Sequence, residues 1–317
     1  MAHRTRLFFA TDLHGSSKCF RKFINAGPAY RADVLVLGGD VAGKALQTIV
    51  RQPDGHWRCA FIGTDYDVAS ETELGELEKL IADHGYYPYR AEPGELDARR
   101  ADGSLDALFV RLMHERLEGW LAFAEDRLAG TGTRLFFMLG NDDPAELQAI
   151  LASAPFGKLA EGEVVTLDDD HEMMSWGYSN LTPWHSHREM TEEQLAEVLE
   201  GLGARLHEPA RAVVNVHVPP YGSGLDDAPV LDADLRVQTV LGQVKFAPVG
   251  STAVRDFELR VQPLLGLHGH IHEASGYRRL GRTLALNPGS DYSTGTLNGA
   301  LITLERDRIV AHQMVRG

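Results

Sequence analysis

Residues 8–15, FFATDLHG, join a short apolar run to two side chains that can bind a metal ion, Asp12 and His14. The run is nearly continuous and rich in Phe, which is typical of a β-strand buried on both faces. Extended backbone would point two side chains at this spacing the same way, so that one ion could contact both. This stretch therefore predicts a strand that ends in a metal-binding group.

Four further segments also join an apolar run to metal-capable side chains: VLVLGGD ending at Asp40, FFMLGND with Asn141, VVNVHVPP with His217, and LLGLHGHIH with His270 and His272. Open α/β sheets build their sites at strand ends. Asp, Asn and His form a mixed oxygen and nitrogen set that suits Mn, Fe or Zn. The recurrence makes coincidence a poor explanation, although a single segment of this kind would be weak evidence.

Apolar runs bounded by Gly, Asp, Asn or Pro predict strands at residues 6–11, 34–38, 134–139, 163–167, 212–218, 264–268, 283–287 and 300–304. Amphipathic patterns predict helices between them, at residues 17–30, 144–154, 191–202 and 251–262. This alternation favours an α/β fold.

Residues 44–132 interrupt the alternation. We expect one weak strand at 56–63, an acidic helix at 71–85, a loop at 91–104 and a long helix at 104–129. We interpret the region as a helical insertion that flanks the sheet, so that residues 1–317 form a single domain.

The chain has 317 residues and a formal net charge of −14. An acidic balance argues against general binding to nucleic acid or to anionic membranes, because both need a surplus of Lys and Arg. No segment reaches the roughly 18 apolar residues of a membrane span, and the N-terminal apolar run is too short for a signal peptide. The two cysteines, Cys19 and Cys59, are expected to be reduced. We expect a cytoplasmic protein.

The seven ligands would form eight coordination bonds if one carboxylate, that of Asp40, bridged two cations. About four bonds for each ion would leave positions open for water and substrate. Two cations about 3.5–4 Å apart clamp the attacking and leaving oxygens of a phosphoryl displacement and lower the pKa of a shared water. The pattern therefore predicts a two-metal hydrolase in which a bridging hydroxide attacks the phosphoester.

The segments resemble the sequence motifs of the calcineurin-like metallophosphoesterases. The matching residues are Asp12-Leu13-His14, Gly39-Asp40, Gly140-Asn141-Asp142-Asp143, His217 and Gly269-His270-Ile271-His272. Further fragments, HVPPYGSGLD, GHIHEASG and LNPGS, look like the Icc-related bacterial and archaeal branch. The resemblance implies a four-layer α/β/β/α sandwich of two mixed sheets flanked by helices. It also implies one metal on Asp12, His14, Asp40 and His272, and the other on Asp40, Asn141, His217 and His270. Mn²⁺ is the expected metal, with Fe or Zn as alternatives.

The sequence departs from the family pattern at Asp142, where the family has a histidine that protonates the leaving group or contacts the phosphate. An ionised carboxylate would repel a phosphate dianion, and it could act as an acid only if burial or a neighbour such as Asp143 raised its pKa. The loss of a general acid costs roughly 10²–10⁴-fold in rate. Asp142 is therefore one candidate catalytic residue. His217, at the end of its own apolar run, is the other. We expect weak activity on monoesters and a small phosphodiester as substrate.

Two alternatives stay open for the acid and two for the function. His185 or His187, in SNLTPWHSHREM, could reach the metals as a replacement acid, although exposed loop residues are the simpler interpretation. A nuclease of the same fold is a rival that the acidic charge disfavours. A catalytically weak scaffold or regulatory protein is the other rival, which the complete ligand set disfavours. GGDVAGKA, at residues 38–45, only approaches a nucleotide-binding P-loop, because Ala45 stands where Ser or Thr should be.

Overall fold

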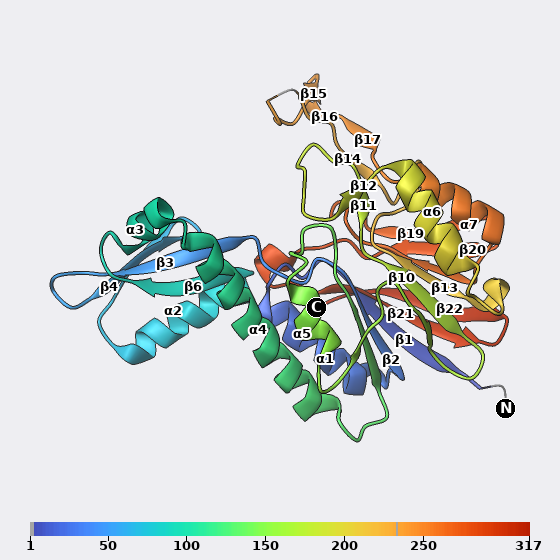
Figure 1. Cartoon of the computed structure of the whole chain (residues 1–317), viewed down its shortest axis with the longest axis horizontal. Coiled ribbons are helices and arrows are strands. Elements are labelled where there is room, and N and C mark those ends of the chain that lie inside the picture. The colour runs from blue at the N-terminus through green and yellow to red at the C-terminus, as the bar shows by residue number, and fades with distance from the viewer. Residues whose placement is uncertain (1–2, 233) are drawn as a thin grey trace.

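The computed structural model describes residues 3–232 and 234–317, and its body is built on two six-stranded sheets packed face to face (Figure 1). The first sheet has the order β22 (Arg308–Arg316), β21 (Asn298–Glu305), β1 (Thr5–Ala10), β2 (Val34–Gly38), β7 (Arg134–Met138) and β8 (Lys158–Leu159). The strands from β1 to β8 are parallel, and β21 and β22 run antiparallel to their neighbours.

The second sheet has the order β19 (Gly276–Leu280), β20 (Thr283–Asn287), β18 (Leu265–Leu267), β13 (Val213–Val216), β10 (Glu172–Trp176) and β9 (Val164–Thr166). Its four central strands are parallel, and the strand at each edge is antiparallel. Both sheets are therefore mixed, as expected.

Alternate residues of each strand pack on opposite faces, because successive side chains of a strand point to opposite sides. Phe8 packs toward the helices outside the first sheet. Its neighbour Phe9 belongs instead to the core between the sheets, together with Val36, Val213 and Leu265. The strands consequently need apolar residues on both faces, which explains their nearly continuous apolar sequences.

Helices cover the outer faces of both sheets. The first sheet packs against α1 (Ser17–Tyr30), α4 (Leu105–Leu128) and α5 (Leu147–Ala152), and the second against α6 (Glu192–Gly203) and α7 (Thr252–Val261). The Ser16 side chain caps α1 by accepting a hydrogen bond from the backbone N–H of Cys19 at 3.3 Å. The expected four-layer sandwich of two mixed sheets flanked by helices is confirmed.

The description of residues 44–132 as helical is wrong, because this region also holds a four-stranded sheet. Its order is β5 (Thr64–Val68), β4 (Trp57–Phe61), β3 (Ala45–Arg51) and β6 (Tyr86–Ala91). The acidic helix α2 (Glu71–Asp83) packs on this sheet around Ile49 and Leu74. A further helix, α3 (Glu95–Asp102), occupies the expected loop. Most residues of β3 are only half-buried, which leaves a weak strand pattern in the sequence.

The insertion contacts the loop that follows the first strand. Arg116, on α4, donates hydrogen bonds to the carbonyl oxygens of Gly15 at 2.6 Å and Tyr86 at 2.9 Å. The Tyr87 hydroxyl accepts a hydrogen bond from the backbone N–H of Gly43 at 3.0 Å. The small sheet therefore extends from the body at the left of Figure 1, but its base is tied to the loops after β1 and β2.

Three two-stranded ladders complete the fold: β11 (Ser179–Asn180) with β12 (Glu189–Met190), β14 (Asp227–Pro229) with β17 (Phe246–Pro248), and β15 (Thr239–Val240) with β16 (Gln243–Val244). Single 3-10 turns lie at η1 (Pro209–Arg211) and η2 (Tyr292–Thr294). Among the helices of the described residues, none combines the length and apolar character that crossing a membrane requires.

We expect Leu74→Ala to destabilise the insertion by about 2–5 kcal/mol, because the Leu74 side chain is fully buried between α2 and the small sheet. Hydrogen exchange should show faster exchange in β3 and β6 and little change in β1 or β13. Leu80→Ala, which shortens a half-buried leucine of the same helix, should have a clearly smaller effect. Equal effects of the two substitutions would contradict this account of the insertion core.

Candidate metal centre

The predicted ligands lie together because the parallel strands of both sheets end at the same side of the molecule. β1 leads to Asp12 and β2 to Asp40 in the first sheet, whereas β13 leads to His217 and β18 to His270 in the second. The two sheets pack face to face, so the loops that leave them meet. This shared edge is where open α/β sheets place their sites.

Four of the predicted ligands have left-handed backbone conformations: Asp12 at φ 54°, His14 at φ 40°, Asp40 at φ 49° and His270 at φ 67°. The assumption of extended backbone at Asp12 and His14 is therefore wrong, although their side chains do converge. A left-handed non-glycine residue costs roughly 1–2 kcal/mol. Such strain gathers where the surrounding structure holds side chains in a functional geometry.

Hydrogen bonds between loops hold this conformation. The backbone N–H of Asp12 donates to the carbonyl of Gly39 at 3.0 Å, and that of His14 donates to the carbonyl of Asp40 at 2.9 Å. Gly269 is needed at the crossing of the loops, because a Cβ there would lie 2.3 Å from the Asp12 Oδ2 atom. The first and last ligand segments are thus fixed against each other.

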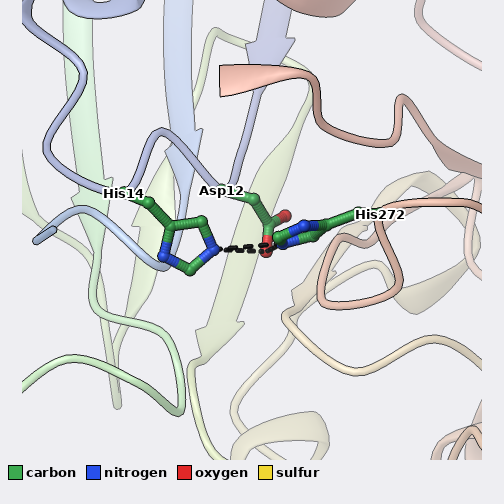
Figure 2. A group of neighbouring side chains, drawn as sticks. All are labelled: Asp12, His14 and His272. Carbon is green, nitrogen blue, oxygen red and sulfur yellow. Dashed lines mark hydrogen bonds and ion pairs between the residues drawn. The ribbon is translucent and has the colours of Figure 1, made fainter. Parts of the chain in front are cut away.

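One group of ligands surrounds the Asp12 carboxylate (Figure 2). The Nε2 atoms of His14 and His272 lie 3.0 Å apart. Asp12 Oδ1 lies 3.4 Å from His272 Nε2 and 3.9 Å from His14 Nε2. Asp40 Oδ2 lies 3.5 Å from His14 Nε2. Three imidazole and carboxylate groups facing one point at these distances can hold one cation.

The Asp40 carboxylate also belongs to a second group of ligands. Its Oδ2 atom lies 3.5 Å from His217 Nε2, the same distance as from His14. His270 Nδ1 lies 2.7 Å from Asn141 Oδ1, and the His270 backbone N–H donates to Asp12 Oδ2 at 3.1 Å. Asp40 Oδ2 is therefore equally distant from His14 and His217, and Asp12, Asp40 and His217 form a compact group that could hold a metal ion.

The His217 side chain carries the clearest sign of a missing partner. Its Nδ1 atom donates to the carbonyl of Gly38 at 2.8 Å, which leaves a lone pair on Nε2 when the ring is neutral. Nε2 is fully buried and has no hydrogen-bond partner among the described residues. Asp40 Oδ2 lies 3.5 Å from Nε2, beyond the usual hydrogen-bond length, so even a proton on Nε2 would be held poorly. A divalent cation among Asp40, Asn141 and His270 would satisfy it, so the residues present fit a metal.

The electrostatics of the site also favour cations. Burial raises the pKa of Asp12, but His217 and His272 outweigh burial and lower the pKa to about 2. Two ionised carboxylates, Asp12 and Asp40, are thus buried side by side. Positive charge must compensate them, because buried unpaired charge costs several kcal/mol.

Asp142 lies beside the ligands but is paired with Lys44, an interaction that the sequence did not reveal. Its Oδ1 atom accepts a hydrogen bond from Asn141 Nδ2 at 3.0 Å. Burial and the nearby Asp40 raise the pKa of Asp142, and Lys44 opposes this. The expected neighbour Asp143 has another role, because its carboxylate accepts from the backbone N–H groups of residues 41, 42 and 140.

His185 and His187, the proposed replacement acids, are both exposed on the loop between β11 and β12. The residue between them, Ser186, is the one that reaches the centre, where it accepts a hydrogen bond from Asn141 Nδ2 at 2.7 Å. Tyr292 is a further neighbour, with its ring centre 4.6 Å from that of His14. Neither Ser186 nor Tyr292 belongs to a recognisable metal-ligand spacing, so no signal in the sequence pointed to them.

Comparison with known proteins supports the fold. TT1561 of Thermus thermophilus matches over 99% of both chains with a TM-score of 0.55 and 12% sequence identity. Another crystal structure matches over 99% of both chains with a TM-score of 0.56 and 14% sequence identity. A dimetal phosphatase from Danio rerio matches over 98% of both chains with a TM-score of 0.46 and 11% identity. At these identities, the first two likenesses show the fold alone. No family profile and no curated protein matches the sequence.

We expect Mn²⁺ affinity to increase with pH. Burial lowers the pKa of His217, but Asp40 and Asp12 outweigh burial and raise the pKa to about 10. Without cations His217 therefore holds a proton at neutral pH, and a cation must displace it.

Calorimetric titration in two buffers of different ionisation enthalpy should show proton release on Mn²⁺ binding between about pH 6 and pH 8. His217→Gln should release fewer protons. An affinity independent of pH over this range would contradict the assignment of His217 as a ligand.

Proposed function

We propose that this protein is a dinuclear-metal-dependent phosphoesterase that hydrolyses a small phosphodiester. The convergence of two buried carboxylates, four histidines and Asn141 on one edge, with the Nε2 atom of His217 left without a partner, carries this proposal. The likeness of the segments to the Icc-related branch of the calcineurin-like metallophosphoesterases supports it. We also propose a cytoplasmic location, in keeping with two free, buried cysteines.

The division of the ligands is the one that the resemblance to the calcineurin-like metallophosphoesterases implies, and the equal distances of 3.5 Å from Asp40 Oδ2 to His14 Nε2 and His217 Nε2 support the shared place of Asp40. Asp12, His14, Asp40 and His272 would hold one cation, and Asp40, Asn141, His217 and His270 the other. Two divalent cations, with Mn²⁺ favoured over Fe or Zn for this oxygen and nitrogen set, would supply Lewis acidity and lower the pKa of water. His217, His270 and His272 would hold the cations that neutralise negative charge on the phosphoryl oxygens.

The preference for a diester rests on Asp142. Its carboxylate lies beside the proposed ligands, where Lys44 compensates its negative charge. A diester brings one further negative charge, whereas a monoester dianion brings two. Burial and the nearby Asp40 raise the pKa of Asp142, and Lys44 opposes this. The ion pair with Lys44 needs the ionised carboxylate, which has no proton to donate to a leaving group. Good leaving groups, which need no protonation, fit this arrangement.

The acidic charge of −14 weighs against a nuclease, because binding along a phosphate backbone needs basic residues. A scaffold without catalysis is the second rival. It would need neither the strained backbone of four ligands nor the partnerless nitrogen of His217.

The proposal is tested by turnover of an activated diester, bis(p-nitrophenyl) phosphate, and an activated monoester, p-nitrophenyl phosphate, with added Mn²⁺. We expect kcat/KM to be higher for the diester. Asp40→Ala should abolish metal binding and turnover, whereas Asp169→Ala, which removes an exposed carboxylate, should leave both unchanged.

Three results would count against the proposal. Full activity of Asp40→Ala would exclude the two-metal mechanism. Metal binding without turnover of either ester would favour the scaffold. Efficient cleavage of single- or double-stranded DNA would favour the nuclease.

A further inference from the structure

The loop between β11 and β12, residues 181–188, touches the candidate metal centre through one hydroxyl group. Ser186 Oγ accepts a hydrogen bond from Asn141 Nδ2 at 2.7 Å and lies 2.6 Å from Glu189 Oε1. An ionised carboxylate can only accept, so the Ser186 hydroxyl must donate to Glu189 and accept from Asn141. This fixes which end of the Asn141 amide faces the loop, and its Oδ1 atom therefore faces His270 and the metal centre.

The Glu189 carboxylate is itself held in place. It accepts from the backbone N–H of Thr182 at 3.1 Å, the Thr182 hydroxyl at 2.5 Å and the backbone N–H of Ser186 at 2.8 Å. The loop is closed on itself around this one side chain, so the position of the Ser186 hydroxyl is well defined.

The other end of the loop is fixed to the Asn141 segment. The backbone N–H of Arg188 donates to the carbonyl of Asn141 at 3.1 Å, and its guanidinium donates to the carbonyl of Gly140 at 3.1 Å. The Arg188 side chain is buried, forms an ion pair with Glu161 and lies 4.3 Å from the ring centre of Tyr178. Loop and ligand segment therefore form one unit.

We propose that Ser186, held by Glu189, is a positioning residue that keeps the Asn141 oxygen turned toward the cation it would share with His217 and His270. The inference rests on the proposed function, since it assumes a cation at this group of ligands. Asp142 Oδ1 also accepts a hydrogen bond from Asn141 Nδ2 at 3.0 Å. Loss of the Ser186 hydroxyl therefore removes one of the two hydrogen bonds that hold this NH₂ group, and the orientation of the amide is less firmly fixed.

Calorimetric titration with Mn²⁺ and measurement of bound metal test this role without reference to turnover. Ser186→Ala should weaken one of the two Mn²⁺ sites about 10–100-fold, the usual effect of removing a group that orients a ligand, and should leave the other site unchanged. Ser186→Thr, which keeps a hydroxyl, should restore most of the affinity. Leu181→Ala, which shortens an exposed side chain on the same loop, is the matched control and should bind as the unmodified protein does.

A double-mutant comparison separates positioning from general damage to the loop. If Ser186 acts through the amide, Ser186→Ala should have little further effect in an Asn141→Ala background. Two Mn²⁺ sites of unchanged affinity in Ser186→Ala, or an equal loss in both backgrounds, would overturn the inference. Absence of Mn²⁺ binding by the unmodified protein would overturn the proposed function as well, so the two failures are distinguishable.

Discussion

The structure depends on the burial of two carboxylates, Asp12 and Asp40, at one point between the two sheets. Their like charges repel, and burial makes the repulsion strong. The chain offers imidazoles from the Asp12 segment itself and from two other segments as partners, and the Nε2 atom of His217 has no hydrogen-bond partner among the described residues. Protons or cations must balance this group, so its charge, more than its apolar packing, distinguishes this edge from the rest of the sandwich.

The body of the fold was largely predictable because its central strands are buried on both faces. Runs at 34–38 and 283–287 coincide with β2 and β20, and the amphipathic stretch at 17–30 coincides with α1. The edge strands β22, β19 and β8 were missed for the opposite reason, whereas the edge strand β9 was predicted at 163–167. β22, for example, has half-exposed and exposed residues along its length, so polar residues dilute its apolar pattern.

The candidate site was predictable to the extent that its residues belong to recognisable spacings. The seven proposed ligands belong to such spacings, and the structure brings them together. Lys44 and Ser186 do not, because their relevance depends on which loops meet in space. Ser186 lies 45 positions from its partner Asn141, a pairing that a single sequence does not encode in any periodic form. Left-handed backbone at Asp12 and His14 was equally invisible, since aspartate and histidine carry no glycine-like signal.

The contact between the insertion and the first ligand loop has a consequence for how such proteins can be altered. A Cβ at Gly85 would lie 2.4 Å from the carbonyl oxygen of His14, so the turn before β6 presses directly on the backbone of a proposed ligand. In the sequence, residues 44–132 have the appearance of a module that could be exchanged for another. In three dimensions these residues pack against the loop that carries His14. A segment that replaced them would have to reproduce the glycine turn at Gly85 or displace His14. Recombination and domain grafting at this boundary are therefore constrained by this backbone contact, in addition to the hydrogen bonds of Arg116 and Tyr87.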